Sequence, residues 1–341
     1  MAFPETNSPE KELALIDEIA RLRQALREQC RENNIYDIIR KEVFELSIKE
    51  FKPPSWIHKE RVSQLQGIPT LFLSDWHWGE VVSPSEINWQ NEYNLEIGAK
   101  RAKRCFDEFI RIYHEESRRD WDGLVVLLGG DMVSGDIHQE LAETNEYPTL
   151  PTVLDCSKHI CAGLELLSRY FDKIMVFGVV GNHGRSSDTK RFKKRVITNY
   201  DWMIYSILER HFEHDESFTF HIPNGSDCYY SIYDTRYLLT HGDQLGGRST
   251  DPIIGAMNSI SAGDRKRRQR QSDIGQPYDV LLCGHWHQLG MLPKRIINGN
   301  LKGVDEYSYG HGFAPESPQQ ASWVTEPRKG ITSMNIINCD N

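Results

Sequence analysis

Five short motifs contain two aspartates, one asparagine and five histidines, whose side chains are suited to binding divalent metal ions. The motifs are Asp75-Trp76-His77, Gly130-Asp131, Asn182-His183, His241 in the segment LLTHGD, and His285-Trp286-His287. Carboxylate and neutral imidazole bind Mn, Fe or Zn, and the absence of cysteine from the motifs disfavours a structural zinc site. A pair of such cations, about 3.5–4 Å apart, activates a hydroxide and clamps a phosphoryl group. The motifs therefore predict a hydrolytic centre with two metal ions.

Each motif directly follows a run of apolar residues that is typical of a buried strand. The runs lie at residues 69–74, 124–129, 174–180, 237–240 and 279–283. Helical periodicity between the runs, as in residues 95–113 and 196–208, predicts parallel βαβ units whose strands end at one edge of a sheet. After residue 215 the pattern becomes richer in strands and more antiparallel. An α/β fold of two sheets packed face to face, with helices outside, is therefore expected.

The i, i+2 spacing within two motifs offers a simple way to bring ligands together. On an extended segment, residues two positions apart point to the same side. We therefore expect Asp75 and His77 to share one side of their segment, and His285 and His287 to share one side of theirs.

The N-terminal region, residues 1–60, is predicted to be a helical appendage to a catalytic domain at residues 61–341. Within a helix expected over residues 8–50, apolar residues recur at helical spacing, namely Leu15, Ile19, Leu22 and Leu26. This stripe fits either an amphipathic helix lying on the catalytic domain or a short coiled coil that makes a homodimer. The prolines in the segment FKPPS, residues 51–55, end the helix because proline lacks an amide donor.

Composition excludes several classes of protein. The chain has 39% hydrophobic and 26% charged residues, as expected of a globular protein with a substantial core. No apolar run approaches the ~20 residues needed to cross a bilayer, and the acidic, polar N-terminus does not resemble a secretory signal. Seven cysteines without a CxxC pair predict free thiols in a cytoplasmic protein. The net charge of −9 argues against nonspecific coating of nucleic acid, although it says nothing about local patches.

The motifs D-x-H, G-D, G-N-H, H and G-H-x-H, in this order over residues 75–287, resemble the calcineurin-like metallophosphoesterase superfamily. The resemblance implies a four-layer α/β/β/α sandwich and two divalent cations. Mn²⁺ is the first candidate, and Fe and Zn are the alternatives. It implies that Asp131 bridges the two cations, with one also held by Asp75, His77 and His287 and the other by Asn182, His241 and His285. It also implies that His183 contacts the phosphate and protonates the leaving oxygen.

Two positions depart from the family pattern. Many relatives carry an acidic residue after the Asn-His pair or three residues after the bridging aspartate, where this chain has Gly184 and Ser134. Asp136 is the predicted substitute that orients His183. Residues near the motifs without a comparable context are interpreted as structural or as packing around the site, namely His138, His159, His221, Trp76, Trp78 and Trp286.

Two basic clusters, residues 190–195 and 265–270, lie close in sequence to ligand motifs. Contact with a phosphate backbone needs such a patch, although a solvated helix face is the common alternative. The predicted substrate-binding residues are Arg185, Lys190, Arg191, Arg265, Lys266, Arg267 and Arg268.

The leading hypothesis is a metal-dependent phosphodiesterase that acts on DNA or RNA. The segment SDWHWGE resembles the opening motif of DNA-repair exonucleases, and INGNLKGVDEYSYGHGF resembles bacteriophage-encoded members of the superfamily. A phosphomonoesterase or small-nucleotide phosphodiesterase is the main alternative. A non-catalytic binding subunit with a decayed metal site is an alternative of another class.

Overall fold

A computed structural model of the protein describes residues 51–58, 67–117, 119–246 and 254–340. The helix predicted over residues 8–50 and its dimer seam lie outside the described residues, as does the boundary at residue 60. The division into residues 1–60 and 61–341 therefore stays a prediction.

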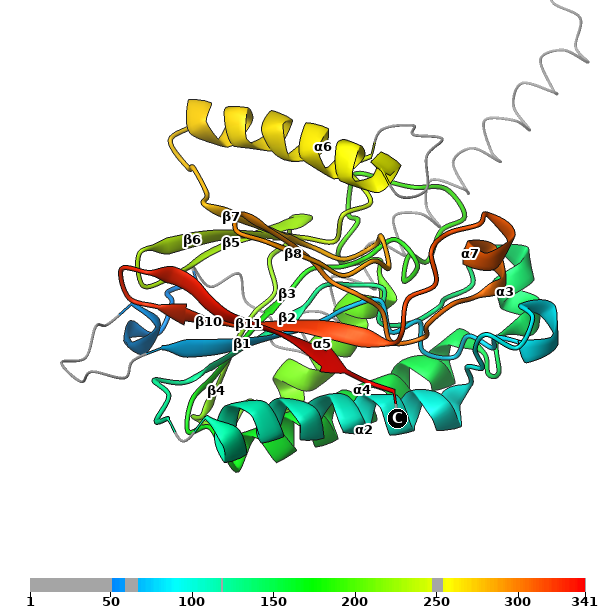
Figure 1. Ribbon diagram of the computed structural model, residues 1–341, viewed down its shortest axis with the longest axis horizontal. Coiled ribbons are helices and arrows are strands. Elements are labelled where there is room, and N and C mark those ends of the chain that lie inside the picture. Colours follow the sequence, from blue (N-terminus) through cyan, green and yellow to red (C-terminus); the bar gives the residue numbers. More distant parts are fainter. Residues whose placement is uncertain (1–50, 59–66, 118, 247–253, 341) are drawn as a thin grey trace, which may run out of the picture. The chain divides into compact units, whose positions relative to one another are not determined.

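A six-stranded sheet forms the centre of the fold, in the order β11-β10-β1-β2-β3-β4 (Figure 1). Its strands are β1 (Ile68–Leu73), β2 (Leu124–Leu128), β3 (Ile174–Gly178), β4 (Phe218–His221), β10 (Gln319–Glu326) and β11 (Gly330–Asn338). β1 to β4 run parallel, whereas β10 runs antiparallel to both β1 and β11. β1, β2 and β3 are buried along their whole length because both faces of the sheet are covered.

Three helices cover one face of this sheet: α2 (Leu95–Ile110), α4 (Thr149–Ser168) and α5 (Tyr200–His211). α2 begins where the side chain of Asn94 accepts a hydrogen bond from the amide of Ile97, and it continues as a π-helical segment, η4 (Arg111–Glu116). α2 and α4 pack closely, since a Cβ added to Gly163 would lie 2.1 Å from the ring of Phe106. These helices and the sheet share one large apolar core.

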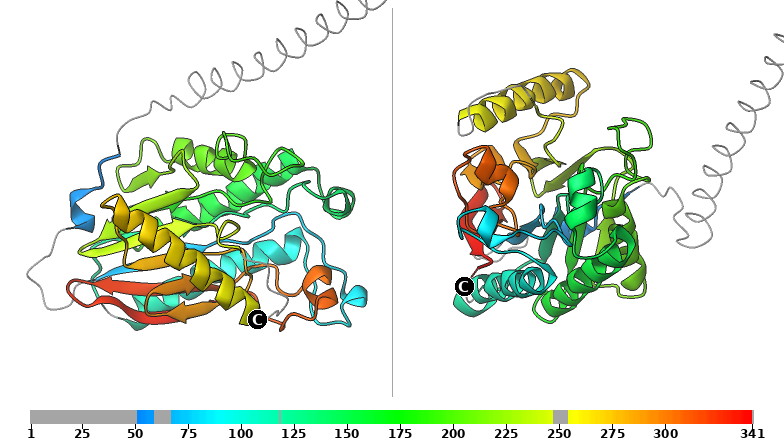
Figure 2. Two further views of the ribbon diagram at one scale, coloured as in Figure 1. Left: turned by 90° about the horizontal axis from the view of Figure 1, so that it is seen from above. Right: turned by 90° about the vertical axis from the view of Figure 1, so that its right-hand side faces the viewer.

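A second sheet has the order β5-β6-β7-β9-β8. Its strands are β5 (Asp227–Ile232), β6 (Thr235–Thr240), β7 (Val280–Cys283), β8 (Gly290–Leu292) and β9 (Arg295–Ile297). β6, β7 and β9 run parallel, and β5 and β8 run antiparallel to their neighbours. A helix, α6 (Ile254–Asp273), lies over the outer face of this sheet (Figure 2), and its Ile260 packs against Leu238 and Leu281.

The two sheets pack face to face through aromatic side chains. The rings of Phe177 on β3 and Tyr230 on β5 stack with their centroids 4.1 Å apart. The hydroxyl of Tyr237 on β6 lies 2.7 Å from the Oγ1 of Thr325 on β10. The predicted four-layer α/β/β/α arrangement is confirmed, and each of the five apolar runs overlaps one of the strands β1, β2, β3, β6 and β7.

Short helices complete the described part: η2 (Ser55–Ile57), η3 (Pro84–Glu86), α3 (Gln139–Thr144) and α7 (Glu306–Gly310). None of the described helices has the length and apolar character needed to span a membrane. The six cysteines in the described ranges are all buried and form no disulfide.

Candidate metal centre

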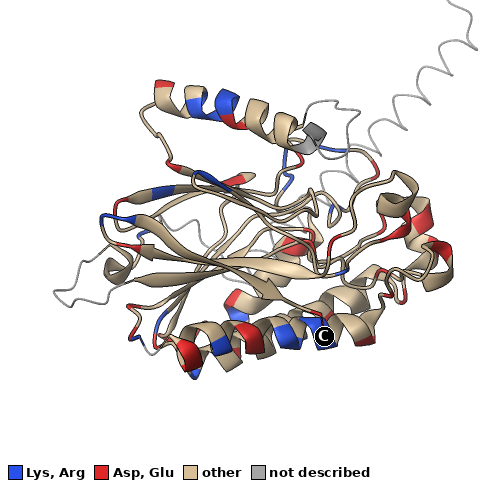
Figure 3. Ribbon diagram, viewed as in Figure 1, with Lys and Arg blue, Asp and Glu red and all other residues tan. Residues whose placement is uncertain are grey.

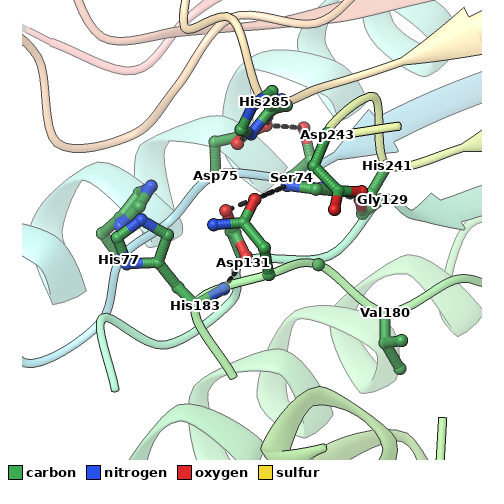
Figure 4. A network of polar contacts seen from close by, with 12 residues as sticks. Ser74, Asp75, His77, Gly129, Asp131, Val180, His183, His241, Asp243 and His285 are labelled. Carbon is green, nitrogen blue, oxygen red and sulfur yellow. Dashed lines mark hydrogen bonds and ion pairs between the residues drawn. The ribbon is translucent and has the colours of Figure 1, made fainter. Parts of the chain in front are cut away.

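The motif residues gather where strands of both sheets end. Asp75 and His77 follow β1, Asp131 follows β2, Asn182 and His183 follow β3, His241 follows β6, and His285 and His287 follow β7. β1, β2 and β3 belong to the first sheet and β6 and β7 to the second, so both sheets contribute to one site. Figure 4 shows the side chains of His77, His183, His241 and His285 around Asp75 and Asp131.

One group of ligands consists of Asp75, His77 and His287, whose ligand atoms all lie within 4.8 Å of one another. The Nε2 atoms of His77 and His287 are 3.0 Å apart. The Nε2 of His287 is also 3.5 Å from the Oδ1 of Asp75. Three atoms that can each donate a lone pair thus face a common point.

A second group consists of Asp131, His241 and His285, and a third joins His77, Asp131 and His183. The Nε2 of His241 lies 2.9 Å from the Oδ2 of Asp131 and 3.2 Å from the Oδ1 of Asn182. Because Asp131 and His77 each belong to two groups, the three groups form one continuous centre.

The contact between His241 and Asp131 shows that this centre fits a cation. The Nδ1 of His241 lies 2.8 Å from the carbonyl oxygen of Gly129, which can only accept, so Nδ1 carries the proton of the neutral ring. The Nε2 lone pair therefore faces the Oδ2 of Asp131, which receives no hydrogen bond from any residue that the structure describes. Burial lowers the pKa of His241, but the carboxylate of Asp131 outweighs it and raises the pKa to about 10. Two facing lone pairs need a proton or a metal ion between them, and the oxygen and imidazole donors suit a divalent metal.

Five of the predicted ligands have a left-handed backbone, with φ of 56° at Asp75, 47° at His77, 52° at Asp131, 71° at His285 and 54° at His287. Such a conformation costs on the order of 1–3 kcal/mol for a non-glycine residue and persists where the surroundings enforce it. The D-x-H motif at residues 75–77 and the H-x-H motif at residues 285–287 are therefore not extended, and that prediction is wrong. The paired residues reach the same site because the chain turns sharply at each of them.

Glycines give the ligands the space that these turns require. A Cβ added to Gly181 would lie 2.0 Å from the Oδ1 of Asp131, and one added to Gly284 would lie 2.2 Å from the Oδ2 of Asp75. Both distances are far below van der Waals contact. The glycines of the G-N-H and G-H-x-H motifs are thus needed for packing against the carboxylates of other strands.

His183 has a hydrogen-bond partner that the sequence does not reveal. Its Nδ1 lies 3.0 Å from the carbonyl oxygen of Ser134, so this nitrogen donates and Nε2 is left unprotonated in the neutral ring. The predicted partner, Asp136, is exposed and forms no hydrogen bond with the described residues. The backbone of Ser134, rather than the predicted side chain of Asp136, therefore orients the imidazole. Burial lowers the pKa of His183, and nearby Asp131 opposes this shift.

Buried carboxylates outside the motifs support the ligand loops. The side chain of Asp201, at the start of α5, accepts hydrogen bonds from the amides of Asp131, Met132 and Gly181 at 2.8 to 3.0 Å. Burial and the nearby carboxylate of Asp131 raise the pKa of Asp201 to about 6. No sequence signal distinguishes Asp201, because it lies in an ordinary helical pattern 70 residues after Asp131.

Glu80 and Lys302 form a second supporting group beside His77. The Oε2 of Glu80 is 3.3 Å from the Nδ1 of His77, and its Oε1 accepts a hydrogen bond from the Nζ of Lys302 at 2.7 Å. Lys302 also pairs with Asp305. All three charged side chains are buried. The position of Glu80 three residues after His77 is a usable signal. Lys302 lies in the segment INGNLKGVDEYSYGHGF, whose resemblance points to the family and not to a contact with Glu80.

The predicted basic residues differ in their availability. Arg185 donates to the carbonyl oxygens of Asn182, Ser187 and Asp188, and is thereby part of its own loop. Four other cations of the two clusters are in ion pairs: Lys190 and Arg195 with Asp243, Arg267 with Asp227, and Arg268 with Asp264. Arg191, Arg265 and Lys266 are exposed. Figure 3 shows that acidic and basic residues alternate along α2, while α6 carries several basic residues.

The remaining histidines and tryptophans divide into two groups. Trp76 and Trp78 are fully buried, so neither can stack on a substrate. The ring of His159 packs 4.8 Å from that of Trp78. By contrast, His138 is exposed with its ring centroid 6.3 Å from that of His183, and it therefore borders the site.

No curated protein matches this chain. Among solved structures it is similar to a conserved uncharacterized protein from Streptococcus pneumoniae, described as a predicted phosphoesterase, with 11% identity, a TM-score of 0.31, and coverage of 80% of this chain and 90% of that chain. It is also similar to a candidate 5′-nucleotidase from Staphylococcus aureus in complex with alpha-ketoglutarate, with 13% identity, a TM-score of 0.37 and coverage of 81% and 55%.

A third similar structure is the sulfate thiohydrolase SoxB from Thermus thermophilus in complex with glycerol, with 9% identity, a TM-score of 0.32 and coverage of 81% and 57%. The chain thus spans little more than half the length of the second and third structures. The sequence profile of the calcineurin-like phosphoesterases matches residues 68–289, which contain all the motifs. The chain therefore belongs to the calcineurin-like phosphoesterases, a family of metal-dependent phosphoester hydrolases.

Proposed function

We propose that the protein is a phosphodiesterase that cleaves DNA or RNA with two divalent cations, Mn²⁺ being the first candidate. One observation carries this proposal: Asp131 and His77 join the three groups of ligands into one centre. His183 belongs to this centre, and the basic segment of residues 190–195 follows it in the sequence. We also propose that the protein is related to the DNA-repair exonucleases or to the phage-encoded members of the family.

We assign one cation to Asp75, His77, Asp131 and His287, and the other to Asp131, Asn182, His241 and His285. Cations held there would supply Lewis-acid polarisation of the phosphoryl group and a water of lowered pKa. The protein's own contribution is to hold these side chains in place, through the turns at Asp75 and Asp131 and through the buried carboxylate of Asp201.

His183 is assigned to proton transfer. Its Nδ1 is held by the carbonyl oxygen of Ser134, which directs the proton-transferring nitrogen, Nε2, away from that backbone. Burial lowers its pKa, so the protonated ring is a stronger acid toward the leaving oxygen than an exposed histidine would be. The imidazole therefore donates a proton from Nε2 as the phosphoester bond breaks.

A phosphomonoesterase or small-nucleotide phosphodiesterase is the second candidate. One observation favours it: Lys190, Arg195, Arg267 and Arg268 are already paired with carboxylates. These pairs reduce the positive charge left for a long polyanion, and a small substrate needs less of it.

The test is a substrate panel with purified protein and Mn²⁺: single-stranded DNA, duplex DNA, RNA, mononucleotides and bis(p-nitrophenyl) phosphate. Cleavage of an internal phosphodiester in a polymer supports the proposal. Hydrolysis of mononucleotides alone would replace it with the second candidate. Failure to hydrolyse any member of the panel in Mn²⁺, Fe²⁺ or Zn²⁺ would instead point to a non-catalytic binding subunit.

A further inference from the structure

The loop of residues 185–195 leads from His183 toward α5 and is attached to the metal centre at both ends. At its start, the guanidinium of Arg185 donates to the carbonyl oxygen of Asn182 at 2.8 Å. At its end, the guanidinium of Arg195 donates to both carboxylate oxygens of Asp243, each at 2.9 Å, and Arg195 is buried. Asp243 lies two residues after the ligand His241, so the loop is held against the site.

A third attachment narrows the free part of the loop. The Nζ of Lys190 lies 2.6 Å from a carboxylate oxygen of Asp243 and 3.2 Å from its carbonyl oxygen. The side chain of Asp243 is almost fully buried, and it pairs with both Arg195 and Lys190. The part of the loop that projects between these attachments consists of residues 191–193.

The tip presents an aromatic ring between cations. Phe192 is 81% exposed and has no ring contact with any described residue. Arg191 and Lys193 are exposed on either side of it, and neither forms an ion pair within the described ranges. Burying a phenylalanine side chain stabilises a fold, and this ring forgoes that contribution.

An exposed ring beside unpaired cations is the combination that binds unpaired nucleotides. Every base has a face that stacks on an aromatic ring, and cations beside the ring neutralise the phosphates that connect the bases. The paired cations Lys190 and Arg195 position the loop, whereas Arg191 and Lys193 remain available to the substrate.

We propose that Phe192 is a base-stacking residue for single-stranded nucleic acid, with Arg191 and Lys193 binding the adjacent phosphates. This inference rests on the proposed nuclease function and adds to it a preference for unpaired substrate. Duplex DNA, whose bases are stacked on one another, cannot use the ring without local opening.

The test measures kcat/KM in Mn²⁺ for a single-stranded oligonucleotide and for bis(p-nitrophenyl) phosphate, which has no base. Phe192→Ala and Phe192→Leu should lower kcat/KM for the oligonucleotide by roughly 5- to 150-fold, since stacking contributes about 1–3 kcal/mol per base. Phe192→Trp should retain it. Hydrolysis of bis(p-nitrophenyl) phosphate should be unchanged in all three variants.

Tyr170→Ala is the matched control, because Tyr170 is 39% exposed and precedes β3, at the opposite end of that strand from Asn182. A second measurement replaces single nucleotides of the oligonucleotide by abasic residues. At the position that stacks, the abasic substitution and Phe192→Ala should each lower kcat/KM, and their combination should lower it no further.

The outcomes separate this inference from the proposed function. If the wild-type protein cleaves no nucleic acid, the proposed function is wrong and the inference falls with it. If the wild-type protein cleaves the oligonucleotide and Phe192→Ala cleaves it equally fast, only the stacking role is overturned. Equal losses in Phe192→Leu and Phe192→Ala with full activity in Phe192→Trp support stacking over simple apolar contact.

Discussion

Backbone carbonyl groups decide which nitrogen of two site histidines carries the proton. The carbonyl oxygen of Gly129 holds the Nδ1 proton of His241, and that of Ser134 holds the Nδ1 proton of His183. In both rings this leaves Nε2 to act, as a ligand in one case and in proton transfer in the other. A carbonyl group cannot be removed by a side-chain substitution, so tests of these roles must change the imidazoles or their charged neighbours.

Asp131→Asn should remove turnover and bound metal together. An amide has one oxygen and no charge, so it cannot serve both groups of ligands to which Asp131 belongs. Metal content measured by mass spectrometry and hydrolysis of bis(p-nitrophenyl) phosphate should both fall to background. Asp136→Asn, at an exposed position in the same loop, is the control and should keep both. Retention of activity in Asp131→Asn would contradict the bridging role.

His183→Gln should leave metal content intact and lower the rate. Loss of a general acid typically costs about 10²–10⁴-fold. The decrease should be smaller for a substrate with a nitrophenolate leaving group, which needs little protonation, than for an oligonucleotide. Loss of a metal ion in this variant would show that His183 is a ligand, as its place in one of the three groups allows.

At the scale of secondary-structure elements, buried ion pairs join loops that lie far apart in sequence. Lys302, four residues before α7, pairs with Glu80 from the loop after β1 and with Asp305 at the start of α7. Burial raises the pKa of Glu80, but Lys302 outweighs it and lowers the pKa to about 2. The pairs thus keep a carboxylate charged beside His77.

Lys302→Met should destabilise the fold by about 3–5 kcal/mol, because it leaves two buried carboxylates without their cationic partner. The free energy of unfolding, measured by urea titration, checks this value. Lys329→Met is the control: Lys329 pairs with Glu326 but is 72% exposed, so its loss should cost at most about 1 kcal/mol. Equal effects of the two substitutions would mean that the buried pairs contribute no more than a surface pair.

The edge strand β4 predicts a pH dependence of stability. Burial lowers the pKa of His221 on β4 from 6.5 to about 4 in the folded protein. As the pH falls, His221 therefore binds a proton in the unfolded chain before it does so in the folded protein. The stability that the neutral ring contributes is fully present above pH 6.5 and is lost as the pH falls toward 4. Because the ring is partly exposed, the loss should be on the order of 1–2 kcal/mol.

The measurement is the free energy of unfolding between pH 7 and pH 4, compared for the wild-type protein and His221→Gln. The variant should lose less stability over this window. His214→Gln is the control, since the side chain of His214 is 94% exposed. If the free energy of unfolding of both variants falls with pH as steeply as that of the wild-type protein, groups other than His221 cause the loss of stability in acid.

The sequence predicts the strands of this fold well because they are continuous apolar runs, and a buried strand needs no other signal. It also predicts which residues meet, because parallel strands end at one edge. It does not predict the left-handed turns at Asp75 and Asp131, since those conformations are imposed by packing against Gly284 and Gly181 from other strands. Contacts such as Lys302 with Glu80 likewise join residues more than two hundred positions apart.

For the molecule as a whole, metal binding and stability should be linked. Ligands that bind only the folded protein stabilise it, by about 2.7 kcal/mol at a concentration one hundred times Kd. Added Mn²⁺ should therefore raise the Tm of protein previously stripped of metal with a chelator. The same addition to Asp131→Asn should have a much smaller effect. An equal shift in both proteins would place the stabilising cation elsewhere.

The position of β1 has a consequence for the order of events during synthesis. β1 (Ile68–Leu73) pairs on one side with β10 (Gln319–Glu326), and the carboxylate of Asp75 accepts a hydrogen bond from the amide of His285. A nascent chain that has exposed the first three motifs still lacks these partners. We therefore expect hydrolytic activity to arise only after the ribosome has released β7 and the segment beyond it. Elements late in the sequence thus complete the site that β1, β2 and β3 begin.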